Sequence, residues 1–225
     1  MQKGDFVRIS YIGRVGDEIF DLTEEDVAKK EKIFNPKIKY KPVPVIIGAG
    51  FVIPGLDEEL EKMKPGEKKK VTIPADRAFG QRKKELVKVV PESAFKKQNF
   101  KPRPGIIVDF SGTKGRIQSA SAGRVRVDFN HPLAGKDLEY EIEIKKQITD
   151  EKEQVEAVIE FFGFPAKSVS LKENAVNIDV DFSKGFPRPE LKARVADVIK
   201  KHVRNVKKIV FVETFEKKKT DSGKA

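Results

Sequence analysis

The chain has 225 residues, of which 38% are hydrophobic and 36% charged, and it carries a net charge of +11. That length exceeds one ordinary domain, and the apolar fraction suffices for two or three modest cores. The absence of cysteine excludes disulfides and a thiol nucleophile, and the two distant histidines, His131 and His202, exclude a histidine-based metal cluster. We therefore expect no cofactor. No stretch approaches the roughly 20 apolar residues of a membrane span, so a cytoplasmic location is expected.

The first 80 residues contain four predicted strands and two predicted helices. Alternating apolar and polar side chains predict a hairpin from residues 5–11 and 19–21. A short helix over 24–34 then gives way to the lysine- and proline-rich segment 35–44, which predicts a surface excursion. The remaining elements are a short strand, a glycine turn, a helix over about 55–63 that ends at Pro65-Gly66, and a strand from 67 to 76.

The basic charge is concentrated in the segment that follows Phe79-Gly80. Residues 84–131 contain 10 Lys and Arg against 4 Asp and Glu. Four short strands and one short helix are predicted here, from the segments 84–90, 91–95, 106–110, 115–119 and 124–129. Residues 138–148 show the cleanest alternation in the chain and predict a strand that returns to the first domain.

The last third of the chain predicts an α+β module of about 70 residues. A helix capped by Thr149 and extending to about 162 precedes strands near 167–171 and 175–182, a helix over 188–203 and a last strand in 207–215. Its apolar positions indicate core packing; they are Val155, Val158, Ile159, Phe161 and Phe162. A dimerisation surface and a second polypeptide-binding surface are both open for this module. Apart from the last alanine, residues 217–225 lack apolar side chains, which predicts a disordered tail.

Three strings carry a resemblance to a known family. The string VIIGAGFVIPGLDEELEKMKPGEKKKVTIPADRAFG, the opening strands and the closing strand LEYEIEI resemble the core of FKBP-type peptidyl-prolyl cis/trans isomerases. The string DFNHPLAGKDL resembles the end of the insert-in-flap domain of SlyD-like chaperones and of the long-type archaeal FKBPs. The segment 35–44 and the C-terminal module are most similar to the long archaeal class.

The resemblance implies an α+β fold with three units. An antiparallel sheet wrapped on a short helix would form the isomerase domain, from residues 1–83 and 132–150. Residues 84–131 would form an inserted, mainly β chaperone domain, and residues 151–216 a C-terminal α+β domain.

The resemblance also implies a pocket for the substrate proline. Its catalytic lining would be Tyr11, Phe20, Asp21, Val52, Ile53, Leu56, Phe79 and Tyr140, with Val43 as a further substrate contact. The backbone N–H of Ile53 would hold the substrate chain, and no residue is assigned as general acid or base. Many members have tryptophan in place of Leu56 and tyrosine in place of Phe79, so a smaller floor and one hydroxyl fewer are expected here.

The inserted segment admits two interpretations. In the first, exposed apolar side chains bind unfolded or nascent polypeptides that contain X-Pro bonds; these are Val87, Val89, Phe95, Phe100, Ile106 and Phe110. In the second, basic side chains contact phosphates of ribosomal RNA; these are Lys96, Lys97, Lys101, Arg103, Lys114, Arg116, Arg124 and Arg126. The string DFNHPLAGKDL favours the first interpretation. A different class also stays open, namely a non-catalytic polypeptide- or RNA-binding module on the same fold.

Overall fold

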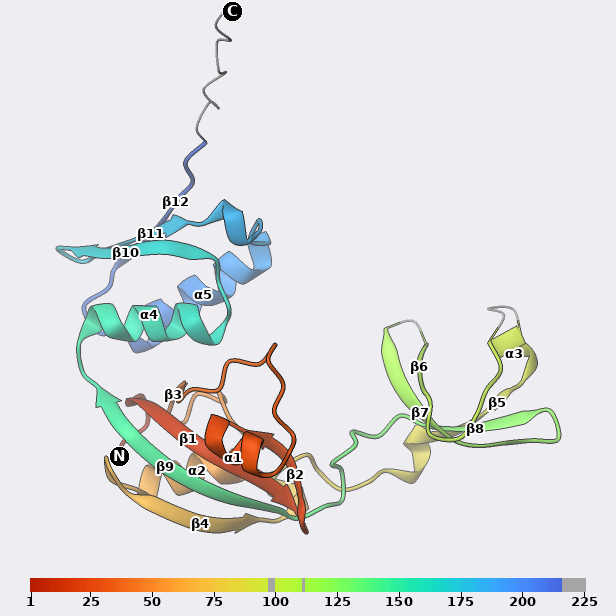
Figure 1. Ribbon diagram of the computed structural model, residues 1–225. Helices are drawn as coiled ribbons and strands as arrows, with labels where there is room; N and C mark the ends of the chain where they lie inside the picture. The colour runs from red at the N-terminus through yellow and green to blue at the C-terminus, as the bar shows by residue number, and fades with distance from the viewer. Residues whose placement is uncertain (97–99, 111, 216–225) are drawn as a thin grey trace, which may run out of the picture.

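The computed structural model describes residues 1–96, 100–110 and 112–215 (Figure 1). The predicted disordered tail, 217–225, and Lys97 lie outside these residues. The described residues form an α+β structure with three separate sheets, as predicted. None of the helices in this part of the chain is long and apolar enough to cross a membrane.

The central sheet contains the chain's opening strands and the strand that returns after the insertion. Its path is β2-β1-β9-β4, β3 pairs with β1, and all pairs are antiparallel. The five strands are β1 (Phe6–Val15), β2 (Glu18–Leu22), β3 (Val43–Ile46), β4 (Lys68–Ile73) and β9 (Leu138–Ile148). The alternation predicted for residues 138–148 is confirmed, because every second side chain from Leu138 to Ile144 is buried.

A short helix packs on one face of this sheet. α2 (Pro54–Lys62) buries Leu56 and Leu60 in the same cluster as Val7 and Ile9 of β1. The other face of β1 is also covered, since Phe6 belongs to a second cluster formed mainly by the C-terminal unit. β1 is therefore a strand buried on both faces over part of its length. The remaining short helices here are α1 (Glu25–Lys30) and the 3₁₀ turns η1 (Ala75–Arg77) and η2 (Lys84–Leu86).

The inserted segment has a sheet and a core of its own. Its strand order is β5-β8-β7-β6, all antiparallel, and its elements are β5 (Val87–Pro91), α3 (Ser93–Lys96), β6 (Ile107–Phe110), β7 (Thr113–Ser121) and β8 (Arg124–Asp128). Phe95, Ile117, Val125 and Val127 form the buried centre of this unit. In Figure 1 the unit projects away from the central sheet at the end of two connecting segments.

One expectation for this insert is wrong. Phe95 was expected to be exposed for substrate binding, but it is only 3% exposed. It packs against Phe100 and Phe110, with ring centroids 6.2 and 5.4 Å away, because a unit this small needs its few aromatic side chains for its own core. Phe100, Ile106 and Phe110 are partly buried against the same core.

The C-terminal unit is a three-stranded sheet covered by two helices. β10 and β11 pair antiparallel, and β11 and β12 pair parallel. The elements are α4 (Glu151–Phe161), β10 (Ala166–Lys172), β11 (Ala175–Val180), η3 (Phe182–Lys184), α5 (Pro189–His202) and β12 (Lys208–Val212). The cap of α4 is Asp150, not Thr149 as predicted. The Asp150 carboxylate accepts a hydrogen bond from the backbone N–H of Glu153 at 2.8 Å, which satisfies a free N–H of the first turn.

Candidate active site

A cavity of about 820 Å³ opens between the central sheet, α2 and the end of α4. Eight of the nine residues predicted for the proline pocket line it, namely Tyr11, Asp21, Val43, Val52, Ile53, Leu56, Phe79 and Tyr140. Leu56 is 2% exposed, so only a small part of this leucine is accessible from the cavity. Apolar groups dominate this set, with one carboxylate and two phenols.

Phe20 is the predicted pocket residue that does not line the cavity. Its ring lies edge-on to Tyr140, with centroids 5.7 Å apart and an interplanar angle of 87°. A Cβ added at Gly13 would lie 2.6 Å from the Phe20 Cζ, so the neighbouring strand needs glycine at this position to let the ring pack. Phe20 thus supports Tyr140 from behind.

Tyr11 and Asp21 form the polar rim. The Tyr11 hydroxyl donates a hydrogen bond of 2.7 Å to Asp21 Oδ2. The backbone holds the two residues in register, because the Tyr11 N–H donates to the buried hydroxyl of Thr23 at 2.9 Å and the Thr23 N–H donates to the Tyr11 carbonyl at 3.0 Å. The ring of Tyr11 also meets that of Tyr140 edge-on, with centroids 5.9 Å apart.

Both phenols are strongly held in the neutral form. Burial, the hydrogen bond to Asp21 and the charge of that carboxylate raise the pKa of Tyr11 far above its ordinary value. Burial and the nearby Asp21 raise the pKa of Tyr140 to about 12. The two hydroxyls therefore remain hydrogen-bond donors across the physiological pH range.

A buried carboxylate shapes the turn that leads into α2. Asp57 is 8% exposed and accepts hydrogen bonds from the backbone N–H groups of Gly48, at 2.8 Å, and Gly50, at 3.4 Å. Both glycines have a positive φ, +73° and +72°, which favours glycine at these two positions. This turn delivers Val52 and Ile53 to the cavity.

Ile53 is the residue that precedes the first turn of α2. Its carbonyl accepts hydrogen bonds from the N–H groups of Leu56 and Asp57. Across residues 1–96, 100–110 and 112–215, its own N–H donates to no other group. This N–H is available to a ligand in the cavity.

His131 contributes to the site indirectly. Its ring stacks on Phe79, with centroids 4.1 Å apart and an interplanar angle of 7°. Its Nδ1 accepts a hydrogen bond from the Leu133 N–H at 3.2 Å, which fixes the turn after the insertion. The stacking on Phe79 gives this turn residue a contact with the pocket lining.

Several cavity residues were not predicted from the sequence. Phe51, Pro44 and Val45 lie close in sequence to predicted lining residues, and Lys39 and Lys41 belong to the predicted surface excursion. The C-terminal unit supplies Glu160, Phe161 and Gly163. Phe161 was expected to pack in the core, but it is 39% exposed because its ring lies at the cavity edge. The part that the C-terminal unit takes in the cavity is seen only once the structure places this unit beside the central sheet.

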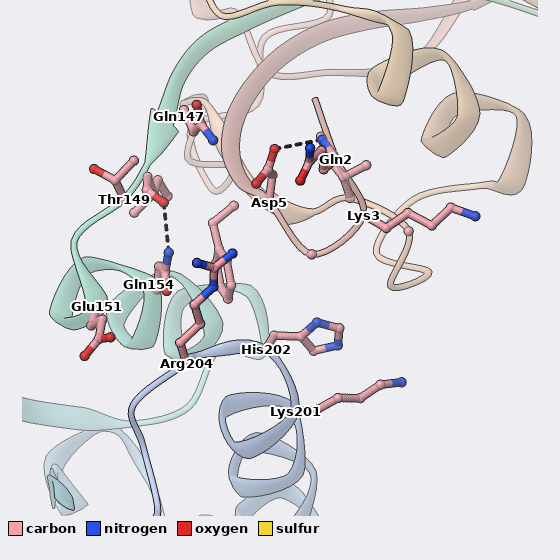
Figure 2. A pocket seen from close by; sticks show the side chains of 15 residues that line it. Gln2, Lys3, Asp5, Gln147, Thr149, Glu151, Gln154, Lys201, His202 and Arg204 are labelled. Atoms are coloured by element: carbon pink, nitrogen blue, oxygen red, sulfur yellow. Dashed lines mark hydrogen bonds between the residues drawn. The ribbon is translucent and has the colours of Figure 1, made fainter. Parts of the chain in front are cut away.

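A second cavity, of about 600 Å³, lies between the amino-terminal segment and the C-terminal unit (Figure 2). Polar and charged side chains dominate its lining, among them Lys3, Lys201, His202 and Arg204. Burial and the neighbouring Lys201 lower the pKa of His202. A lining with so many charged side chains does not suit an apolar proline ring. Among the described residues, no group of three or more His, Asp or Glu side chains is placed to hold a metal ion.

The chain is similar to known peptidyl-prolyl cis/trans isomerases. The short-type peptidyl-prolyl cis-trans isomerase of Methanocaldococcus jannaschii is 37% identical over 145 residues, which are 64% of this chain and 92% of that protein. The chain belongs to the FKBP-type peptidyl-prolyl cis/trans isomerases. A probable FKBP-type 16 kDa isomerase of Pseudomonas fluorescens is 34% identical over 108 residues, 46% of this chain and 71% of the relative.

The inserted segment matches known proteins as well. The FKBP-type isomerase SlyD of Helicobacter pylori is 28% identical over 149 residues, 64% of this chain and 76% of that protein. A family model described as "FKBP26, IF domain" matches residues 88–133. The predicted membership of the FKBP-type isomerases, with a SlyD-like insertion, is therefore confirmed.

Proposed function

We propose that this FKBP-type isomerase turns over X-Pro bonds in the cavity of about 820 Å³. The observation that carries the assignment is the pairing of an apolar floor with a polar rim at which the Tyr11 hydroxyl and Asp21 are 2.7 Å apart. A proline ring fits among Val52, Ile53 and Tyr140, and the free N–H of Ile53 binds the carbonyl of the substrate chain.

Such a site needs no covalent chemistry. Rotation about a prolyl bond is opposed by a barrier of about 18–20 kcal/mol, because twisting the amide removes its resonance. The twisted amide has less charge separation than the planar form, so a dry apolar surface favours it. This is preferential binding of the transition state. Tyr11 and Asp21 orient the chain at the rim and transfer no proton.

The insert, in this proposal, holds unfolded polypeptides near the catalytic cavity. Its sheet has two edge strands, β5 and β6. Each edge carries an exposed apolar side chain, Val89 at 63% and Ile107 at 58% exposed. An extended client segment binds such an edge through backbone hydrogen bonds and apolar contacts. Holding the client raises the local concentration of its X-Pro bonds at the cavity.

The two segments that connect the insert to the central sheet meet at Lys83 and Asn130. The Asn130 side chain bridges the two connecting segments, since it accepts from the Lys83 N–H at 2.8 Å and donates to the Lys83 carbonyl at 2.9 Å. A variant in which a short glycine-serine turn replaces residues 84–129 retains Lys83, Asn130 and His131, the residues of this bridge and of the stacking on Phe79.

This variant separates the two parts of the proposal. Catalysis on a short Leu-Pro peptide should stay within about two-fold of the intact chain, whereas catalysis of a proline-limited protein refolding reaction should fall by about 10²-fold or more. The double variant Val89→Ser, Ile107→Ser should show the same selective loss. Equal refolding catalysis by the variants and the intact chain would contradict the chaperone role.

Two further expectations stay predictions. A ribosomal RNA contact is supported by β8, where the exposed Arg124 and Arg126 alternate with buried valines. Binding to a single-stranded RNA that weakens steeply as salt rises would support it, and salt-tolerant binding of unfolded protein would favour the chaperone role. Dimerisation through the C-terminal unit is supported by its exposed Phe186 and Phe215, at 76% and 74% exposed. A single monomeric mass in solution at micromolar concentration would contradict the dimer.

A further inference from the structure

The C-terminal unit shares a hydrophobic core with the central sheet. Phe6 of β1, Ile46 of β3 and Ile148 of β9 are each at most 2% exposed, and they belong to one cluster with Val155 and Val158 of α4. A shared core of this kind fixes α4 against the back of the central sheet. The unit is therefore packed on the isomerase domain through buried apolar side chains.

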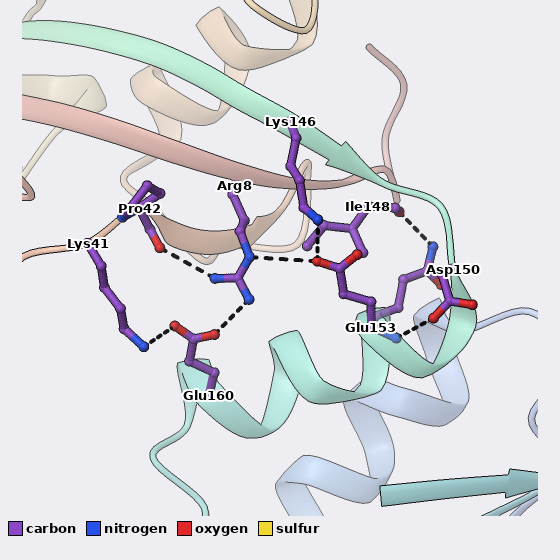
Figure 3. A network of polar contacts seen from close by, with 9 residues as sticks. Arg8, Lys41, Pro42, Lys146, Ile148, Asp150, Glu153 and Glu160 are labelled. Atoms are coloured by element: carbon purple, nitrogen blue, oxygen red, sulfur yellow. Dashed lines mark hydrogen bonds and ion pairs between the residues drawn. The ribbon is translucent and has the colours of Figure 1, made fainter.

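A network of ion pairs sets the position of the last turn of α4 (Figure 3). Glu160 of α4 pairs with Arg8 of β1, with Nη2 and Oε2 2.8 Å apart, and with Lys41, with Nζ and Oε1 2.6 Å apart. At the other end of the helix, Glu153 pairs with Lys146 of β9 at 2.6 Å. The helix thus has charged anchors to the sheet near both ends.

The anchored end of α4 forms one wall of the prolyl cavity. Glu160, Phe161 and Gly163 line the cavity together with Tyr11 and the α2 residues. The Phe161 ring lies 4.0 Å from that of Phe51, at an interplanar angle of 39°. Phe51 directly precedes the Val52-Ile53 pair. An aromatic ring from the third unit is therefore held beside the proposed binding site for proline.

Phe161 remains partly open to a ligand. Its side chain is 39% exposed even though Phe51 covers one side and Phe162 meets it edge-on, with centroids 5.3 Å apart. Exposed aromatic surface at the edge of a pocket favours contact with an apolar partner. Phe161 and Leu56 line the same cavity, so a residue next to a proline bound over Leu56 has its side chain on the path to this ring.

We propose that Phe161 is a specificity-determining residue of the isomerase, which binds the apolar side chain next to the proline of the substrate. The proposal rests on the assignment of the cavity as the prolyl site. It gives the C-terminal unit a direct part in substrate choice: the unit completes the active site. Large aliphatic and aromatic neighbours of proline are then favoured over alanine.

The test is a set of X-Pro-Y peptides in which X or Y is Ala, Leu or Phe while the other position stays Ala. The intact chain should have a higher kcat/KM for Leu or Phe than for Ala at one of the two positions. In Phe161→Ala this preference should disappear through a loss of about 10-fold on the Leu and Phe peptides, with less than about two-fold change on Ala-Pro-Ala. Phe161→Leu should restore most of the preference.

The matched control is Phe186→Ala, which removes an exposed phenylalanine of the same unit outside the cavity and should leave all peptides unchanged. Thermal unfolding of each variant checks that it is folded, and Phe161→Gln, which keeps a long side chain but loses the apolar surface, serves if Phe161→Ala is not. An equal loss on every peptide would show a purely structural role and overturn the proposal, as would an unchanged preference. Absence of catalysis by the intact chain would instead overturn the prolyl assignment itself.

Discussion

At the scale of single residues, the hydrogen bond between Tyr11 and Asp21 orders the polar rim of the cavity. In Tyr11→Phe the ring remains and the hydroxyl is lost, so the carboxylate loses a donor worth about 1.5–3 kcal/mol. Part of that contribution acts on substrate, and we expect kcat/KM for a short X-Pro peptide to fall by about 3- to 30-fold. Tyr40→Phe removes a hydroxyl that binds the Asn35 N–H outside the cavity and should have no effect. Equal rates for the two variants would contradict a role for the rim.

The two phenols of the cavity, Tyr11 and Tyr140, should make catalysis insensitive to pH up to about pH 10. Because the pKa of Tyr140 is about 12 and that of Tyr11 is raised further, both hydroxyls stay protonated well above the ordinary tyrosine value of 10.0. We predict that kcat/KM, measured by exchange NMR, changes by less than about two-fold between about pH 7 and pH 10. A fall centred near pH 10 would show that at least one of these phenols titrates normally.

The contributions of individual residues were predicted unevenly. Tyr11, Asp21, Ile53 and Tyr140 were identified through a local motif, and the structure places all four at one cavity. Phe20 was misplaced because strand alternation does not say which aromatic ring faces a cavity and which supports it from behind. Phe161 was assigned to the core because it lies three residues after Val158, on the same side of the predicted helix. A sequence pattern does not show which other unit of the protein packs opposite that side.

At the scale of elements, the turn before α2 depends on Asp57. Its carboxylate accepts two backbone hydrogen bonds from the glycine turn while only 8% exposed. Asp57→Ala should destabilise the protein by about 1–3 kcal/mol in urea unfolding, because it removes the charged acceptor of two backbone hydrogen bonds. It should also lower catalysis, since Ile53 follows this turn. Asp26→Ala, at an exposed site on α1, is the control and should change stability by less than about 0.5 kcal/mol.

Most elements were predictable, whereas their ends and contacts were less so. The strand β9 was clear because one face is buried and the other partly exposed along most of its length. The buried first half of β1 does not alternate cleanly, because Phe6 packs under the C-terminal unit while Val7 packs on α2. The predicted N-cap of α4 was wrong by one residue, because threonine and aspartate both cap helices well. The hydrogen bond from the Glu153 N–H identifies Asp150 as the cap.

At the scale of the whole molecule, Glu160 links α4 to the central sheet. Burial raises the pKa of its carboxyl, but the hydrogen bonds and charges of Arg8 and Lys41 outweigh burial and lower it overall below the ordinary 4.5. A carboxylate with a lowered folded pKa stabilises the fold above its ordinary pKa, and this contribution is lost as the pH falls through the folded value. The difference in unfolding free energy between the intact chain and Glu160→Gln should therefore shrink as the pH falls below 4.5.

Glu156→Gln is the matched control for this measurement. Glu156 lies one turn earlier on α4, is 47% exposed and pairs only with Lys152 of the same helix among the described residues. Its replacement should change the unfolding free energy little at any pH, because an exposed pair contributes little. A pH dependence that is the same for both variants would contradict a specific role of Glu160 in docking the C-terminal unit.

The most direct test of the catalytic assignment is exchange NMR on a short Leu-Pro peptide, with catalytic amounts of the intact chain or of the double variant Asp21→Ala, Phe79→Ala. Uncatalysed exchange takes roughly 10–100 s at room temperature, so acceleration is readily seen. We predict clear acceleration by the intact chain and its collapse in the folded double variant. Full activity in that variant would place catalysis elsewhere, and no activity in the intact chain would leave a non-catalytic binding protein on an isomerase fold.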